Sequence, residues 1–394
     1  MKKILLFVFF FAISSVGQNI VTKKVKSTVL NQKREILIYE PVEMSIKPES
    51  RFEVIYVFDA QSRNYFDFVH SSAQFIKGQH KAFIIVGIIS PLDEAKKQSR
   101  NTDFLPVAQH PETKADYQGY SGGADKFMHF LNEEIFPFIE KEYRVFPERI
   151  AIGHSNGGTF ITYCLLNQPE MFNAYIAVSP NLAYDRGQLI NELQKLDPNT
   201  IPGQKYFYMS RANEGSDNGF NDWNIAYDKA IAIMEKPGFS KKIKFISEDF
   251  SQSQSHYSTF PFGTLSGLNA YLNYRFYNAE NGIAYYEDLN KKGLLNLTAD
   301  FLSKYAYDCF EKNQKDNALA IMDYTISKHP ADHALYNLKA EFYELSGDNR
   351  QASQWYKKAL DVLNSQRAGY NEILYNEVFK LYDRNYKRAV SKIK

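Results

Sequence analysis

The first two thirds of the chain alternate between short, nearly continuous apolar runs and longer amphipathic stretches. The runs 52–59 (FEVIYVFD) and 82–89 (AFIIVGII) are rich in β-branched and aromatic residues, as expected of strands buried on both faces. Further runs of this kind lie at 149–153, 174–179, 206–210 and 243–247. Because helical patterns lie between these runs, we predict an α/β fold with right-handed crossovers, a mostly parallel sheet and helices on both faces.

Two other stretches refine this α/β prediction. Residues 25–30 and 34–40 come before the buried runs, and we predict that they form an opening antiparallel pair of strands. Apolar residues recur at a spacing of three to four over 124–143, which is typical of an amphipathic helix. Pro137 interrupts this pattern, and because proline lacks an N–H we expect a kink there.

From about Leu297 onward the strand patterns stop and only helical periodicity remains. This part of the chain matches itself at a separation of 34 residues, with Asn313 aligned to Gly347 at the turn between helices and Pro330 closing the first unit. Leu302, Ala306, Ala318 and Met322 align with Tyr336, Ala340, Ala352 and Tyr356. The period and the small residues resemble tetratricopeptide (TPR) repeats, in which alanines let paired helices approach closely.

The resemblance to TPR repeats has one departure and leaves alternatives open. The seventh position of the second unit is Lys339, where the repeat family prefers leucine. An ordinary helical bundle with a chance alignment of alanines is the alternative. Two repeats are fewer than independent stability requires. We therefore expect them to dock on the α/β part, to pair with another chain, or to be capped by a helix near 370–388.

The N-terminus has the pattern of a secretory signal. A basic start, Met1 to Lys3, precedes the apolar run 4–13, which is too short for a stable membrane anchor, and 15–17 are small residues. We predict a signal peptide over 1–17, with Gln18 as the first mature residue, and export to the periplasm or the medium without stable membrane insertion. A retained anchor helix is the alternative.

Charge and cysteine content narrow the classes of partner. The chain has 394 residues with 47 basic and 45 acidic side chains, and loss of the signal with its two lysines leaves these numbers equal. A neutral chain argues against nucleic-acid binding, which needs a basic surface. Cys164 and Cys309 are too few for a disulfide framework, and we predict that both are buried. No Cys/His cluster has metal-ligand spacing, so we expect no metal and no cofactor.

The candidate chemistry centres on 153–158, Gly-His-Ser-Asn-Gly-Gly. A GxSxG pattern alone is common, but here it follows an apolar strand and opens an apolar helix, the context of a nucleophile elbow. The turn that exposes Ser155 is strained, and Gly153 and Gly157 leave room for it. We predict that Ser155 is a nucleophile. The alternative is a glycine-rich turn with a capping serine.

A serine hydroxyl needs a base, which in this arrangement follows it in the chain. Three histidines lie beyond Ser155, and only His256 falls in the α/β part, in a polar loop after the last strand. The acid should follow the strand at 205–210, where Glu214 stands first and Asp217 and Asp222 compete with it. We predict His256 as the base and Glu214 as the acid, with the two aspartates left open.

An oxyanion hole requires two N–H groups aimed at the developing negative charge. The residue after the nucleophile, Asn156, supplies one main-chain N–H. For the second we predict the main-chain N–H of Gln61, in the loop that follows the strand 52–59. Asp59 in the same loop is expected to shape it and to take no part in the chemistry.

Residues 25–275 resemble the esterase branch of the α/β-hydrolases, which includes enterobactin-type siderophore esterases, feruloyl and acetyl-xylan esterases and esterase D (S-formylglutathione hydrolase). The matching segments are 57–60 (VFDA), 85–88 (IVGI), 100–106 (RNTDFLP), 122–125 (GGAD), 136–143 (FPFIEKEY), 153–158 (GHSNGG) and 179–180 (SP). The resemblance implies an α/β-hydrolase fold with Ser155 as nucleophile, His256 as base and Glu214 as acid. This chain departs from the family at two places. It has Ala60 where the family often has glycine, and Tyr257-Ser258-Thr259 where the family loop is commonly rich in glycine and serine. These departures leave the substrate open.

These patterns together predict a signal peptide (1–17), an α/β-hydrolase domain (18–280) and a helical TPR-like region (297–394). The expected function is an exported ester hydrolase that works through an acyl-enzyme. A siderophore lactone, a feruloyl or acetyl sugar ester and a peptide-like substrate all stay open. One alternative is acyl transfer by the same residues. Another is a non-catalytic hydrolase-fold scaffold whose repeats bind a protein partner.

Overall fold

The computed structural model describes residues 19–393 except 47, 77–81, 91–98 and 215–220. The predicted signal peptide lies outside the described residues. An eight-stranded sheet forms the centre of the larger part, with strand order β1-β2-β4-β3-β5-β6-β7-β8. The strands are β1 (Asn19–Ser27), β2 (Gln32–Glu40), β3 (Phe52–Val57), β4 (Phe83–Ile88), β5 (Val145–His154), β6 (Ala174–Val178), β7 (Lys205–Arg211) and β8 (Ile243–Asp249).

The pairing of the strands confirms the predicted sheet. β1 pairs with β2, and β2 with β4, in antiparallel fashion, whereas β4, β3, β5, β6, β7 and β8 run parallel to one another. The central strands β3 and β4 are buried along their whole length, as their continuous apolar runs predict. β1 begins six residues before the predicted start at Val25, because its alternating half-exposed pattern suits an edge strand that apolar runs alone do not reveal.

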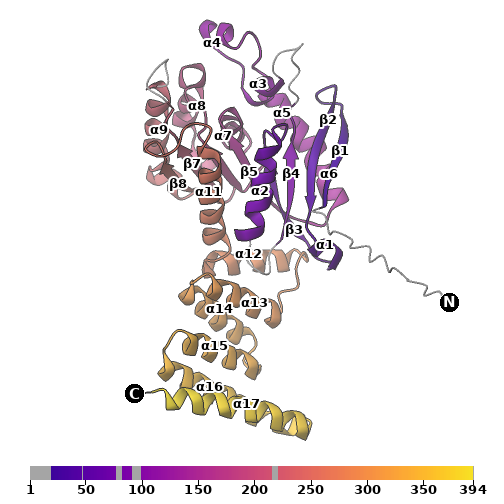
Figure 1. Cartoon of the computed structure of the whole chain (residues 1–394), viewed down its shortest axis with the longest axis vertical. Coiled ribbons are helices and arrows are strands. Elements are labelled where there is room, and N and C mark those ends of the chain that lie inside the picture. The colour runs from indigo at the N-terminus through magenta and orange to yellow at the C-terminus, as the bar shows by residue number, and fades with distance from the viewer. Residues whose placement is uncertain (1–18, 47, 77–81, 91–98, 215–220, 394) are drawn as a thin grey trace, which may run out of the picture.

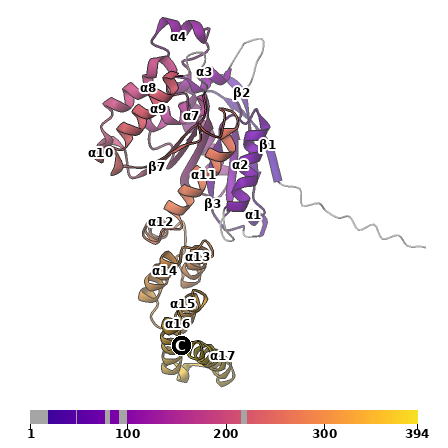
Figure 2. The same cartoon turned by 60° about the vertical axis from the view of Figure 1, so that its left-hand side comes forward.

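Helices cover both faces of the sheet (Figures 1 and 2). One face packs against α5 (Ala124–Phe130), α6 (Phe136–Glu142), α7 (Asn156–Asn167), α8 (Tyr184–Lys195), α9 (Asn221–Met234) and α10 (Pro237–Ser240). The other face packs against α2 (Arg63–Ile76) and α11 (Thr259–Arg275). Short helices α1 (Glu43–Ile46), α3 (Ser99–Phe104) and α4 (Pro111–Asp116) lie in the connections. Among the described residues, no helix has the length and apolarity to cross a bilayer.

The predicted interruption at Pro137 takes the form of a widened turn. A π-helical segment, Leu131–Ile135, joins α5 to α6, and the N–H of Phe136 donates to the carbonyl of Leu131, five residues back. Proline cannot donate to the preceding turn. The extra residue in this turn lets the helix continue past Pro137, as π-bulges do elsewhere.

A buried ion pair joins β2, the second strand in the sheet, to the loop that carries α3. Arg34 of β2 makes two hydrogen bonds of 2.7 and 2.8 Å with Asp103, and the side chains are 1% and 6% exposed. The hydroxyl of Ser90, after β4, donates to the same carboxylate at 2.7 Å. Because a buried charge needs such partners, this cluster fixes the position of the segment 99–104.

The C-terminal part is all-helical, as predicted. It consists of α12 (Ala279–Lys291), α13 (Ala299–Glu311), α14 (Lys315–Lys328), α15 (His333–Leu345), α16 (Asn349–Ser365) and α17 (Glu372–Ser391). The pair α15 and α16 begins 34 residues after the pair α13 and α14, and the equivalent turn residues Asn313 and Gly347 both have left-handed backbone, with φ of 58° and 82°. Cys164 and Cys309 are both buried free cysteines.

Lys339, which departs from the repeat pattern, is buried between helices. Its ammonium group forms an ion pair with Asp323 of α14 and lies 3.8 Å from the ring centre of Trp355 of α16. A cation held against an aromatic ring and paired with a carboxylate can occupy a site where the pattern expects leucine.

The first helices of the C-terminal part share a hydrophobic core with the sheet. Side chains of α12, α13 and α14, among them Leu302, Ala306 and Ile321, belong to the same buried cluster as the sheet face under α2 and α11. Within these helices, the N–H of Ala279 of α12 donates to Asn317 Oδ1 of α14 at 3.0 Å. Leu335 and Phe342 of α15 also belong to this cluster, whereas the buried side chains of α16 and α17 pack in smaller clusters, and α15 to α17 extend away from the sheet (Figure 1).

Candidate active site

Ser155 lies at the sharp turn between β5 and α7. Its backbone has φ 56° and ψ −125°, a conformation that is strained for a residue with a side chain. A Cβ at Gly153 would lie 2.4 Å from the carbonyl oxygen of Gly157, so only glycine fits there. A Cβ at Gly157 would lie 3.1 Å from Asp59 Oδ2. The two glycines thus leave the room that the predicted elbow requires.

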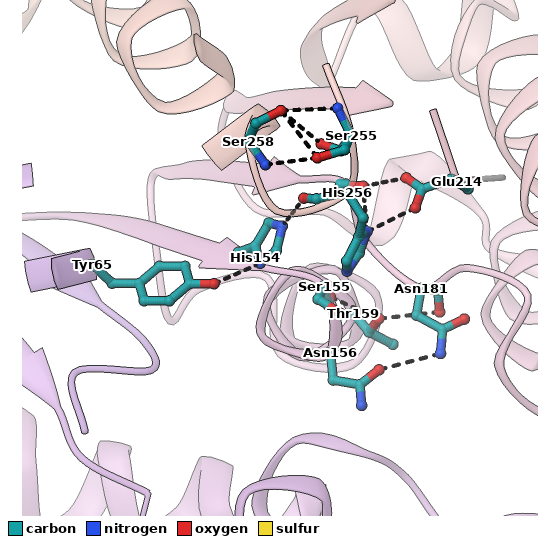
Figure 3. A network of polar contacts seen from close by, with 11 residues as sticks. Tyr65, His154, Ser155, Asn156, Thr159, Asn181, Glu214, Ser255, His256 and Ser258 are labelled. Carbon is teal, nitrogen blue, oxygen red and sulfur yellow. Dashed lines mark hydrogen bonds and ion pairs between the residues drawn. The ribbon is translucent and has the colours of Figure 1, made fainter. Parts of the chain in front are cut away.

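His256 and Glu214 are brought together from neighbouring strands. Glu214 follows β7 and His256 follows β8, and Glu214 Oε2 lies 2.7 Å from His256 Nδ1 (Figure 3). The Glu214 side chain is fully buried, whereas the imidazole is 22% exposed. Because a carboxylate only accepts hydrogen bonds, Nδ1 carries a proton in this pair, and in the neutral imidazole Nε2 is then an acceptor. The N–H of Asn213 donates to the carbonyl of Gln254 at 2.8 Å and ties the two loops together.

The predicted catalytic residues line one cavity of about 770 Å³. Ser155, Glu214 and His256 all line it, together with Asn156. Asp222, a competing acid, is exposed on α9 and lines a different cavity. Asp217, the other competitor, lies outside the described residues. Of the acids with a described position, Glu214 is the one that pairs with the histidine.

Ser179 is a contact of both Glu214 and His256 that the sequence patterns did not single out. Its hydroxyl donates to Glu214 Oε1 and lies 3.1 Å from His256 Nδ1. Ser179 follows β6 directly, is buried, and has a left-handed φ of 45°. The only available signal was its place in the Ser-Pro segment, since no local pattern links it to residues 35 and 77 positions away.

The side chain of Gln61 makes hydrogen bonds that fix the loop in which it lies. Gln61 Nε2 donates to Asp59 Oδ1 at 2.7 Å, and Gln61 Oε1 accepts from the N–H of Ser90 at 3.0 Å. Asp59 is buried with φ 67° and pairs with Arg100, whose Nη2 lies 2.7 Å from Asp59 Oδ2. Asp59 therefore shapes this loop. The oxyanion roles of the main-chain N–H groups of Asn156 and Gln61 stay predictions.

The short helix α3 contacts the elbow from the outside. Asn101 Oδ1 accepts from Asn156 Nδ2 at 2.9 Å, and Arg100 Nη2 reaches the carbonyl of His154 at 3.4 Å. Asp103 binds Arg34 as described above. The segment 100–106, identified from the resemblance, thus connects the elbow to β2.

The side chain of His154, the residue before the candidate nucleophile, is buried beneath the loop of His256. His154 Nε2 lies 2.7 Å from the main-chain oxygen of His256, and its Nδ1 lies 3.1 Å from the hydroxyl of Tyr65 of α2 (Figure 3). Burial, with a further contribution from His256, lowers the pKa of His154 to about 3. His154 is therefore neutral at ordinary pH.

The remaining wall of the cavity is polar and aromatic. Asn181 Nδ2 donates to the hydroxyl of Tyr117 and to Asn156 Oδ1, each at 3.2 Å. Trp223 lies edge-on to His256, with 5.3 Å between the ring centres. The loop 251–255 adds serine and glutamine side chains. Within the described ranges, no group of three or more His, Cys, Asp or Glu side chains is placed to hold a metal ion.

Comparison with known proteins finds similarity to esterases. The family model described as "Putative esterase" matches residues 27–217, a segment that includes Ser155 and Glu214 and ends before His256. The ferri-bacillibactin esterase BesA of Bacillus subtilis is 32% identical over 168 residues, which are 40% of this chain and 57% of that protein. A siderophore enterobactin esterase of Emericella nidulans is 30% identical over 124 residues, 28% of this chain and 40% of that protein. The chain thus spans only about half the length of these curated relatives.

Solved structures show the same fold. An IroE-like serine hydrolase from Shewanella oneidensis superimposes with a TM-score of 0.58 at 22% identity, covering 78% of this chain and 98% of that one. A protein from Capnocytophaga ochracea superimposes with a TM-score of 0.54 at 18% identity and covers 93% of this chain and 99% of that one. At these identities the likeness shows the fold alone. The second match extends beyond the α/β part into the helices that follow it.

Proposed function

We propose that this protein is a serine hydrolase of carboxylic esters, with Ser155 as nucleophile, His256 as base and Glu214 as acid. The observation that supports this most is the Glu214–His256 pair beside the strained Ser155 turn, on the same cavity. The esterase family model and the siderophore esterases among the relatives support the same reaction class.

The proposed reaction passes through an acyl-enzyme. Ser155 Oγ attacks the ester carbonyl while His256 Nε2 takes the hydroxyl proton, and the oxyanion that forms accepts hydrogen bonds from the main-chain N–H groups of Asn156 and Gln61. Collapse of this intermediate breaks the ester C–O bond, and the imidazolium gives its proton to the leaving alkoxide. A water molecule then repeats the sequence on the acyl-serine and releases the acid. Glu214 stabilises the imidazolium in both halves.

The substrate is proposed to be a small molecule, either a siderophore lactone or a carbohydrate-linked ester. The names of the curated relatives favour the first, and the polar and aromatic cavity wall around Tyr117 and Trp223 suits either. Hydrolysis of an ester panel containing a catecholate trilactone, a feruloyl sugar and an acetylated sugar tests the proposal, with Ser155→Ala as control. Turnover of at least one ester by the wild type and of none by the variant is expected. Equal release of acid by the two proteins would refute it.

We further propose that residues 1–17 are an export signal and that the chain then comprises an esterase domain (18–280) and a TPR-like region (297–394). The 34-residue offset between helix pairs and the left-handed turns at Asn313 and Gly347 support the repeat assignment. The shared core at α12 to α14 supports docking of these helices on the esterase domain. A chain ending at residue 296 is then expected to lose solubility or melting temperature, because an apolar face becomes exposed. A stable, fully active truncated enzyme would favour the alternative, a region that serves a separate protein partner.

A further inference from the structure

The histidine that precedes the candidate nucleophile contacts the main chain of the candidate base. His154 Nε2 and the main-chain oxygen of His256 are 2.7 Å apart, although the two residues are 102 positions apart in the chain. Because a carbonyl oxygen can only accept, Nε2 must carry the proton and donate. In a neutral imidazole Nδ1 is then an acceptor, which matches the Tyr65 hydroxyl 3.1 Å away. The geometry thus fixes the tautomer of His154.

The contact reaches the main chain of the base itself. The loop 250–258 that carries His256 contains several exposed residues, Tyr257 being 80% exposed. Glu214 and Ser179 hold the imidazole of His256 at Nδ1, but they contact only the side chain. The His154 bond holds the main chain of the same residue, from a side chain that is 2% exposed.

His154 is itself firmly placed. It is the last residue of β5, and its ring packs against Tyr65 of α2 and Phe260 of α11, with ring centres 5.7 and 5.8 Å apart. The Nη2 of Arg100 approaches its carbonyl oxygen. Since Ser155 is the next residue, the donor and the nucleophile belong to one rigid turn.

We propose that His154 is a positioning residue that sets the distance between the nucleophile and the base by holding the main chain of His256. This inference rests on the proposed function, because it assigns a role relative to Ser155 and His256. A shift of the base by about an ångström can lower the rate of the chemical step roughly 100-fold. Loss of the His154 donor should therefore act mainly on kcat and leave the cavity wall unchanged.

Two substitutions separate the hydrogen bond from the packing. His154→Leu fills much of the ring volume but cannot donate, whereas in His154→Gln the amide nitrogen reaches about as far as Nε2 and can donate. We expect His154→Leu to lower kcat about 10- to 100-fold with KM within about threefold of wild type. His154→Gln should recover kcat to within about fivefold. The rate of Ser155 modification by a fluorophosphonate should follow kcat in both variants.

His70 provides a matched control. It is also a buried histidine on the same face of the sheet, but it packs on Tyr39 with ring centres 4.1 Å apart, away from the cavity. His70→Leu should keep kcat within about twofold of wild type, whatever its effect on melting temperature. A His154→Leu enzyme with wild-type kcat, or equal losses in His154→Leu and His154→Gln, would overturn the positioning role. If Ser155→Ala remains active, the proposed function itself fails. If that variant is inactive and His154→Leu is unimpaired, only the positioning role fails.

Discussion

Glu214 Oε2 lies 2.7 Å from His256 Nδ1, and the carboxylate is fully buried. Replacing it with the uncharged, similarly shaped Gln removes the negative charge that would stabilise the imidazolium. We expect Glu214→Gln to lower kcat by roughly 10²- to 10⁴-fold, as loss of the acid does in other serine hydrolases. Steady-state hydrolysis of any ester turned over by the wild type measures this effect.

Asp222 on α9 is the matched control for that substitution. It is exposed and lines another cavity, so Asp222→Asn should leave kcat within about twofold of wild type. A larger loss in Asp222→Asn than in Glu214→Gln would show that the acid has been assigned to the wrong residue.

Breaking the buried ion pair between Arg34 and Asp103 should lower the stability of the fold more than breaking an exposed pair does. Asp103→Asn keeps the shape of the side chain but leaves the Arg34 charge, 1% exposed, without its counter-ion. Breaking a buried pair in this way costs about 3–5 kcal/mol, so the melting temperature should fall by several degrees. Asp67→Asn removes a partner from the half-exposed pair with Arg63 and should cost less than about 1 kcal/mol. Equal melting temperatures for the two variants would contradict this ranking.

The low pKa of His154 predicts how stability depends on pH. The unfolded chain has a histidine pKa near 6.5, whereas burial lowers that of His154 to about 3. Between these values the unfolded state binds more protons, so the folded state loses up to about 1.4 kcal/mol per pH unit as pH falls below 6.5. His154→Gln removes this group, and its melting temperature should fall less than that of wild type between pH 7 and pH 5. Parallel pH curves for the two proteins would exclude a neutral buried His154.

A single glycine tests how closely α12 and α13, the first two helices of the C-terminal part, pack against each other. A Cβ on Gly282 of α12 would lie 1.7 Å from the hydroxyl of Tyr305 of α13, whose side chain is buried. Gly282→Ala should therefore force a shift at this contact and lower stability by about 1–3 kcal/mol, as overpacking does elsewhere. Gly369→Ala meets no atom within 4 Å and is the control that should be neutral. An unchanged melting temperature in Gly282→Ala would show that the two helices are not closely packed.

The elements that the sequence predicted correctly are those set by neighbouring residues. The buried runs of β3 and β4 and the glycines around Ser155 act within a few positions, so periodicity and turn chemistry reveal them. Helix α12 (Ala279–Lys291) begins at the predicted end of the α/β domain, and the sequence patterns did not single it out as an element.

The contacts that complete the candidate site could not be predicted in this way. Ser179 reaches His256 across 77 positions and His154 reaches it across 102. Such contacts depend on the order of strands in the sheet, which places the ends of β5, β6, β7 and β8 side by side. The strand order, which local pattern does not determine, therefore decides which polar side chains meet.

The most direct measurement is the site of covalent modification by a fluorophosphonate probe. If Ser155 is the nucleophile, the protein takes up one equivalent of the probe, mass spectrometry of the digested protein finds the phosphonyl group on Ser155, and ester hydrolysis is lost in proportion to modification. Ser155→Ala should remain unmodified with an unchanged circular dichroism spectrum. Modification of another serine together with loss of activity, or full activity in Ser155→Ala, would show that Ser155 is not the nucleophile.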